Sequence, residues 1–122
     1  MSAVLPVLAA DMTGYYRTDL PIDCFENSTS RHVCHVEQGL NIKRRNESSY
    51  YLWIHTEGNY NHFCSFQGIA QIKKGLLVSN GDNCKVSVEI KGRDASVGSA
   101  GEGCANYCGA NVELVIDGLK KK

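Results

Sequence analysis

The sequence predicts an all-β fold, either a small antiparallel β-sandwich or a curled barrel stapled by disulfides, and three observations lead to this prediction. Most of the chain after Gly14 alternates between apolar and polar residues with period two. Turn-forming residues recur about every 8 to 12 residues. Six cysteines among 122 residues can pair and hold together a domain of this size. Since no segment keeps a helical period, we expect at most one short helical turn, at residues 104–108.

The N-terminal segment looks like the end of an export signal. Residues 3–10 form an uncharged apolar run that ends in small residues, as at a signal-peptide cleavage site, although no positively charged region precedes it. We therefore expect residues 1–10 to be a signal-peptide remnant or a disordered N-terminus, residues 11–119 to be a single domain, and residues 120–122 to be a basic tail. The alternative is an N-terminal strand of a cytosolic protein. The run is far shorter than the roughly 20 residues of a membrane-spanning helix, so no membrane span is predicted.

The strands follow from the alternation of side chains. Two strands are predicted near the N-terminus at 13–17 and 20–25, and two more at 32–37 and 40–44, each bounded by polar or glycine-rich sequence. The segment 50–57 has large side chains at both alternating sets of positions, which suits a strand that is covered on both faces.

The second half of the chain repeats a simpler pattern. In the segments 63–73 and 84–91, apolar and polar residues alternate strictly, so each strand should have one face in the core and one face in water. Shorter strands are expected at 76–79 and 111–116. The turns between them contain glycine, asparagine and aspartate, as short antiparallel connections require.

Six cysteines allow fifteen pairings, and pairing between neighbours in sequence is the simplest. It would give the disulfides Cys24–Cys34, Cys64–Cys84 and Cys104–Cys108. In a flat three-stranded meander, the α-carbons of Cys64 and Cys84 would lie about 9.6 Å apart, beyond the roughly 7 Å that a disulfide can span. This pairing therefore requires a strongly curled sheet.

Metal and catalytic sites find little support in the sequence. Residues with possible metal ligands are His32, Cys34, His35, His62 and Cys64. Their spacing does not match the paired knuckles of structural zinc sites, so neither a metal nor another cofactor is predicted. An even number of cysteines leaves no obvious free thiol for a cysteine nucleophile, and CANYC is one residue longer than a thioredoxin-type motif. The glutamates are scattered, and we predict that the protein is not an enzyme.

Recognition is the remaining function. Basic and acidic residues balance, giving a net charge of zero, so nucleic acid is not an expected partner. A disulfide across the short loop CANYC would stabilise the fold least, and we predict that it fixes the shape of a recognition loop. Tyrosine and arginine are favoured at interface hot spots. The predicted partner-binding residues are Arg44, Arg45, Tyr60, His62, Asn106 and Tyr107. Each could equally be an ordinary turn residue that covers one end of the fold.

The segments GYY, HFCSFQGIAQIKKGLLVS, NCKVSVEIKG and CANYCGANVELVIDG together resemble small exported β proteins of Gram-negative bacteria. These are the periplasmic lysozyme inhibitors and the periplasmic immunity proteins that neutralise cell-wall-attacking effectors of type VI secretion. The resemblance covers residues 14–119. It implies a non-catalytic domain whose loops block the active-site cleft of a peptidoglycan-cleaving enzyme, and the candidates here are loops 44–50, 57–62 and 103–109.

The leading hypothesis is therefore a periplasmic or secreted inhibitor, or immunity protein, for a peptidoglycan-acting enzyme. The alternative is an exported module that binds a glycan or another small ligand, with Trp53 and the tyrosines as stacking surfaces.

Overall fold

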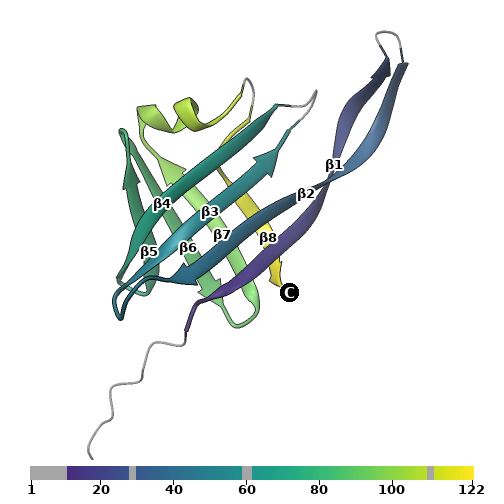
Figure 1. Cartoon of the computed structure of the whole chain (residues 1–122). Helices are drawn as coiled ribbons and strands as arrows, with labels where there is room; N and C mark the ends of the chain where they lie inside the picture. The colour runs from purple at the N-terminus through teal and green to yellow at the C-terminus, as the bar shows by residue number, and fades with distance from the viewer. Residues whose placement is uncertain (1–10, 28–29, 59–61, 110–111) are drawn as a thin grey trace, which may run out of the picture.

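The structure is a computed structural model that describes residues 11–27, 30–58, 62–109 and 112–122, without the side chains of residues 23–32. Within the described residues, eight antiparallel strands close into a barrel, and each strand lies beside its neighbours in sequence (Figure 1). The strands are β1 (Gly14–Asn27), β2 (Ser30–Arg44), β3 (Ser49–Glu57), β4 (Phe63–Lys73), β5 (Leu76–Gly81), β6 (Cys84–Lys91), β7 (Asp94–Ala100) and β8 (Ile116–Lys121). A 3₁₀ helix, η2 (Glu102–Tyr107), lies between β7 and β8. The all-β prediction is confirmed, and the architecture is a closed barrel rather than a sandwich.

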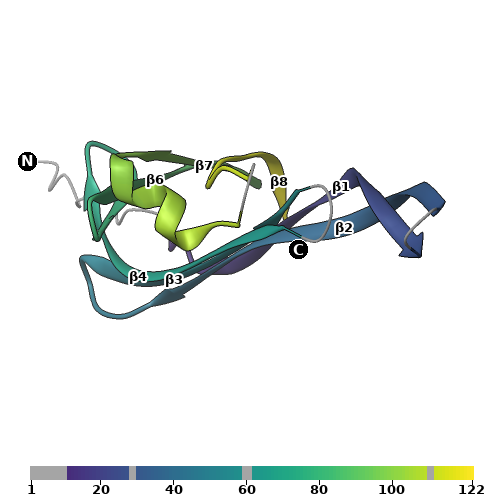
Figure 2. The same ribbon diagram turned by 90° about the horizontal axis from the view of Figure 1, so that it is seen from above.

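The first hairpin is longer than the sequence indicates. The four strands predicted between residues 13 and 44 are two continuous strands, β1 and β2, which pair along almost their whole length. Only the part of β2 from Gly39 onward pairs with β3, and β1 pairs with β8 only at Tyr16 and Arg17. The remainder of the hairpin therefore extends from the barrel as a two-stranded arm (Figures 1 and 2).

The C-terminal strands differ from the prediction. The strand expected at 111–116 is instead β8, which begins at Ile116, and β7 was not predicted. Small residues dominate β7, so its sequence gives a weak strand signal. Lys120 and Lys121, predicted to belong to a basic tail, are part of β8, because Leu119 is buried beside them and Lys120 pairs with Asp94 of β7.

The barrel interior is the hydrophobic core. Its largest fully buried side chains are Tyr16, Leu40, Ile42, Tyr50, Leu52, Phe66, Leu77, Val86, Val88, Leu114, Ile116 and Leu119. In β3 the inward side chains are buried as expected, but the outward Tyr51 and Trp53 are each 37% exposed. The prediction of a strand covered on both faces is therefore wrong. The outer face of β3 is exposed to solvent and carries aromatic side chains.

The disulfides join other partners than neighbours in sequence. Cys64 is bonded to Cys108, and Cys84 is bonded to Cys104, so the predicted pairs Cys64–Cys84 and Cys104–Cys108 are wrong. The reason is geometric: η2 places its own Cys104 against β6, and the residue that follows η2, Cys108, lies beside β4.

The third predicted disulfide, Cys24–Cys34, falls partly outside the described side chains, because the side chain of Cys24 is not described. Cys34 itself is disulfide-bonded.

Candidate functional site

The helix η2 closes one end of the barrel by filling a gap between two strands. Among the described residues, β4 pairs with β5 only from Gln71 to Lys73, so β5 leaves most of that edge of β4 without a paired strand. The chain after η2 takes the vacant place: the amide of Gly109 donates to the carbonyl oxygen of Phe63 at 2.8 Å, and Cys108 forms a β-bridge with Cys64. The disulfide Cys64–Cys108 reinforces this bridge.

Tyr107 is mainly a structural residue at this end. Its ring meets the edge of the Phe66 ring, with 5.0 Å between the centroids, and its hydroxyl accepts a hydrogen bond from the amide of Asp82 at 3.1 Å. Tyr107 therefore contacts both sides of the gap between β4 and β5: Phe66 belongs to β4, and Asp82 belongs to the turn that follows β5. Tyr107 is therefore half-buried and offers only part of its surface to a partner.

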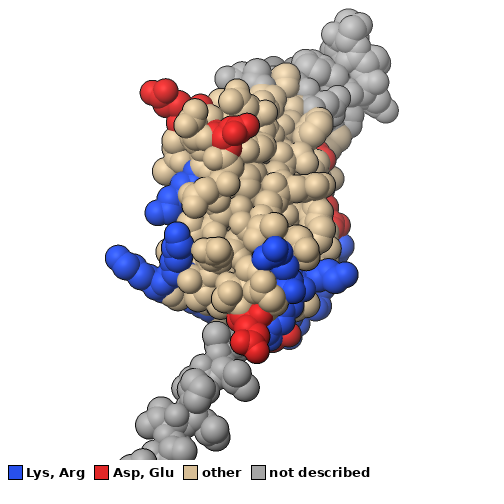
Figure 3. All heavy atoms as spheres, turned by 60° about the vertical axis from the view of Figure 1, so that its left-hand side comes forward, with Lys and Arg blue, Asp and Glu red and all other residues tan. Residues whose placement is uncertain are grey.

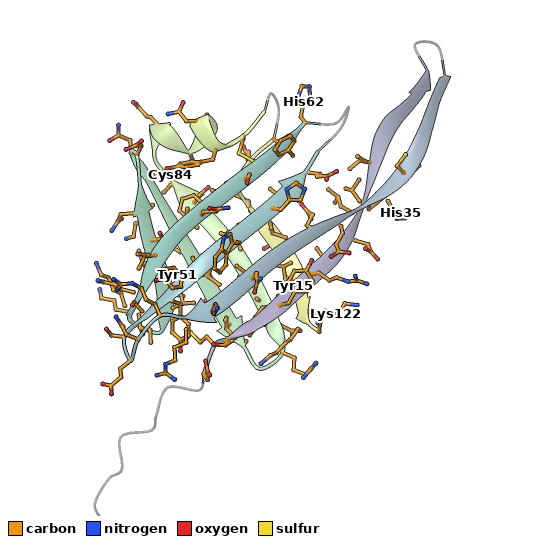
Figure 4. The ribbon with its side chains drawn as sticks, viewed as in Figure 1. Tyr15, His35, Tyr51, His62, Cys84 and Lys122 are labelled. Carbon is orange, nitrogen blue, oxygen red and sulfur yellow. A yellow bond between two sulfur atoms is a disulfide. The ribbon has the colours of Figure 1, made fainter. Side chains whose placement is uncertain are left out.

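Three of the predicted partner-binding residues come together at this end. His62, Asn106 and Tyr107 line a depression of about 290 Å³ together with Phe63, which the sequence did not single out and which is 51% exposed. We call these four residues the helix-end surface. Figure 4 shows His62 at this end of the barrel, near η2. The predicted Tyr60 lies outside the described residues.

The two predicted arginines do not belong to this surface. Arg44 and Arg45 lie at the β2–β3 turn, whereas the helix-end surface begins at the other end of β3, about 26 Å away along a nine-residue strand. Their guanidinium groups bind the turn itself: Arg44 donates to the carbonyl oxygen of Asn46 at 3.2 Å, and Arg45 donates to the hydroxyl of Ser49 at 3.3 Å. Turn stabilisation is thus the role that these contacts support.

A second surface lies on the outer face of strands β1 to β4. Register places Tyr15 opposite Asn41, Asn41 opposite Trp53, and Trp53 opposite Gln67, so the four side chains form one row across four strands. We call it the aromatic–amide row. The row lines a depression of about 320 Å³ whose lining also includes Glu37, Gly39 and His55. The sequence drew attention to Trp53, but the row depends on strand register and could not be read from spacing.

The ring of Tyr15 is held in place by its surroundings. It lies over Gly39, where an added β-carbon would come within 2.9 Å of the Tyr15 hydroxyl. That hydroxyl donates a hydrogen bond to Glu37, whose other carboxylate oxygen pairs with Arg17 at 2.8 Å. The hydrogen bond to Glu37, with burial and the carboxylate charge, raises the pKa of Tyr15 above its ordinary value of 10.0. The phenol therefore stays protonated as a donor.

Substituting Glu37→Gln is expected to lower the pKa of Tyr15 toward 10.0, because the phenolate would no longer face a negative charge. In the native protein the raised pKa means that this contact contributes stability below about pH 10, which is lost as the pH rises through the folded-state pKa. An NMR titration of the Tyr15 ring measures the shift. The matched control is Glu57→Gln, since Glu57 pairs with His55 and not with Tyr15. Equal titration of Tyr15 in wild type and Glu37→Gln would contradict the assignment.

Both surfaces offer aromatic rings beside groups that form hydrogen bonds. Among the described residues, no group of three or more histidine, cysteine or carboxylate side chains is placed to hold a metal ion. The five described cysteines are all disulfide-bonded. The described part of the chain contains no helix long and apolar enough to cross a membrane.

Figure 3 shows a broad face that is nearly free of charged side chains, with lysine and arginine gathered toward its lower end.

Comparison of the chain with models of known protein families, with curated proteins and with solved structures found no match. The class of protein that the fold and surfaces define is a small, disulfide-bonded, antiparallel β-barrel.

Proposed function

We propose that this protein is a non-catalytic inhibitor, or immunity protein, that acts in the periplasm or outside the cell by binding a peptidoglycan-acting enzyme through its helix-end surface. The observation that carries the proposal is the double anchoring of η2. One disulfide ties Cys104 within this six-residue helix to β6, and a second ties Cys108, directly after the helix, to β4, so the segment that bears Asn106 is fixed before any partner arrives. A preformed loop loses little conformational entropy on binding, which is how rigid inhibitors reach high affinity.

The composition of the helix-end surface supports protein recognition. Phe63 offers an exposed ring, and the ring of His55 lies beside it, with 5.7 Å between the centroids. Asn106 and His62 add hydrogen-bonding groups at the rim of the same depression. An aromatic anchor beside polar groups is the usual arrangement at the centre of a protein interface. Disulfides also favour an oxidising compartment, where wall enzymes act.

The test is to mix the purified protein with a panel of lysozymes and secreted wall hydrolases and to measure both binding by calorimetry and the rate of peptidoglycan digestion. We expect one of these enzymes to be bound and inhibited. Phe63→Ala should weaken that binding by about thirtyfold, the cost of removing a hot-spot anchor worth about 2 kcal/mol.

The control is Arg45→Ala, which removes a large side chain at the opposite end of the barrel and should leave inhibition unchanged. Absence of binding across the panel would reject the proposal. Inhibition that is lost in Arg45→Ala but retained in Phe63→Ala would place the interface at the β2–β3 turn instead.

A further inference from the structure

The aromatic–amide row has a regular composition that the proposed inhibitor function does not use. Along the row, an aromatic ring on β1 is followed by an amide on β2, an aromatic ring on β3 and an amide on β4. Tyr15 and Trp53 are 39% and 37% exposed, and Asn41 and Gln67 are exposed between and beside them. Nothing in the described structure covers this row, and none of its four side chains is charged.

This composition suits a neutral sugar better than an ion or an apolar chain. A pyranose ring has C–H faces that pack on an aromatic ring, while its hydroxyl and acetamido groups require partners that both donate and accept hydrogen bonds. An amide side chain does both, since it has two N–H donors and a carbonyl acceptor. A fatty chain would leave Asn41 and Gln67 unpaired. A charged ligand would find no counter-charge within the row, and Glu37, which lines the same depression, is already paired with Arg17.

The spacing within the row suits an extended oligosaccharide. Tyr15 and Trp53 stand on strands two apart, so their backbones are separated by about 10 Å. That separation matches alternate rings of an extended β-linked sugar chain, with the ring between them placed over Asn41. The two aromatic rings are also restrained before binding: Tyr15 by Gly39 and Glu37, and Trp53 by the ring of Tyr51, whose centroid is 6.0 Å away. Figure 4 labels Tyr15, at one end of the row, and Tyr51, the neighbour of Trp53.

We propose that the aromatic–amide row is a binding site for a neutral, extended, β-linked oligosaccharide. Its rings stack on Tyr15 and Trp53, and its polar groups bond to Asn41 and Gln67. The site lies on the side wall of the barrel and is distinct from the helix-end surface.

Trp53 is the single tryptophan of the chain, so its fluorescence reports on this site alone. Titration with chitotetraose, a neutral β-linked oligosaccharide, should change the Trp53 emission in a saturable way at millimolar concentrations. Maltotetraose, whose α-links curve the chain, should give a much smaller change. Gly39→Ala should weaken chitotetraose binding about tenfold, because the added methyl group displaces the Tyr15 ring without requiring a left-handed backbone. Trp53→Ala, measured by calorimetry, should weaken it at least as much.

Phe63→Ala is the matched control, because it removes another exposed aromatic ring from the same sheet, one that packs on His55 and on none of the four residues of the row. Chitotetraose affinity should be unchanged in Phe63→Ala, whereas enzyme inhibition should be retained in Trp53→Ala and Gly39→Ala. The two variant sets thus separate failure of this site from failure of the proposed inhibitor function. No response of Trp53 to chitotetraose, or equal affinity in Gly39→Ala and wild type, would overturn the proposal. So would sedimentation showing a dimer that Trp53→Ala dissociates, since the row would then be a self-association surface.

Discussion

Replacing Cys64 and Cys108 together with alanine is expected to lower the free energy of unfolding by about 4 kcal/mol. The disulfide joins residues 44 positions apart, and closing so long a loop restricts the unfolded chain strongly. The Cys84–Cys104 pair spans 20 positions, so its removal should cost less, about 3 kcal/mol. A domain of this size has a total stability of roughly 5–15 kcal/mol, and either loss is a large fraction of it.

Thermal unfolding of the two double-alanine variants, followed by circular dichroism under non-reducing conditions, measures these losses. The two variants control for each other, because each removes one buried cysteine from a strand and one half-buried cysteine from the η2 region. We expect melting temperatures roughly 10–20 °C below that of the wild type, with the lower value for the Cys64/Cys108 variant. A fall of less than about 1 kcal/mol in either variant would mean that strand pairing, and not the disulfide, holds the barrel end closed.

Period-two alternation predicted the central strands well. The segments 63–73 and 84–91 coincide with β4 and β6, because one buried face and one wet face leave a strict pattern in the sequence. The same rule failed where small residues replace apolar ones, as in β7. It also divided β1 and β2 into shorter pieces, since a polar residue or a proline interrupts the pattern while backbone pairing continues through Pro21.

Disulfide pairing could not be predicted because it depends on where η2 lies. Proximity in sequence favours Cys104–Cys108, but Cys104 in the 3₁₀ helix and Cys108 just after it face different strands. Cys64 lies beyond the part of β4 that pairs with β5, and the segment after η2 takes the place beside it, so Cys64 bonds to Cys108 and not to Cys84. Disulfide pairing depends on contacts between segments far apart in sequence, and the alternation of apolar and polar residues does not predict those contacts.

The candidate sites were predicted in the same uneven way. The sequence places His62 and Asn106 in loops, and the fold brings them together because the start of β4 and η2 meet at one end. The residue type of Tyr107 suggests an interface, but its ring packs beside Phe66. Of the aromatic–amide row, the sequence indicates Trp53 and the tyrosines as stacking surfaces but not the two amides, because only strand register sets Asn41 and Gln67 beside the tryptophan.

The close approach of η2 to the turn after β5 gives the second large expected effect. A β-carbon added at Gly103 would overlap the carbonyl oxygen of Asp82, which is backbone and cannot rotate away. Gly103→Ala should therefore push η2 outward and break the 2.9 Å hydrogen bond from the Gly103 amide to the carbonyl oxygen of Asn83. We expect a loss of about 3 kcal/mol from overpacking together with the lost hydrogen bond. Because Cys104 follows directly, formation of the Cys84–Cys104 disulfide should also be impaired.

Gly98→Ala is the matched control, since a β-carbon at Gly98 in β7 would meet no atom within 4 Å. That variant should keep wild-type stability or gain about 0.5 kcal/mol, because alanine restricts the unfolded chain more than glycine does. Thermal melting and a count of reactive thiols in each purified protein distinguish the two variants. Gly103→Ala should melt roughly 10 °C below the wild type and contain free thiol. Gly98→Ala should match the wild type in thiol content and melt no lower. Equal melting of the two variants would show that η2 can be displaced freely. A displaceable η2 would not present Asn106 in a fixed position, and the rigid-loop argument for inhibition would lose its support.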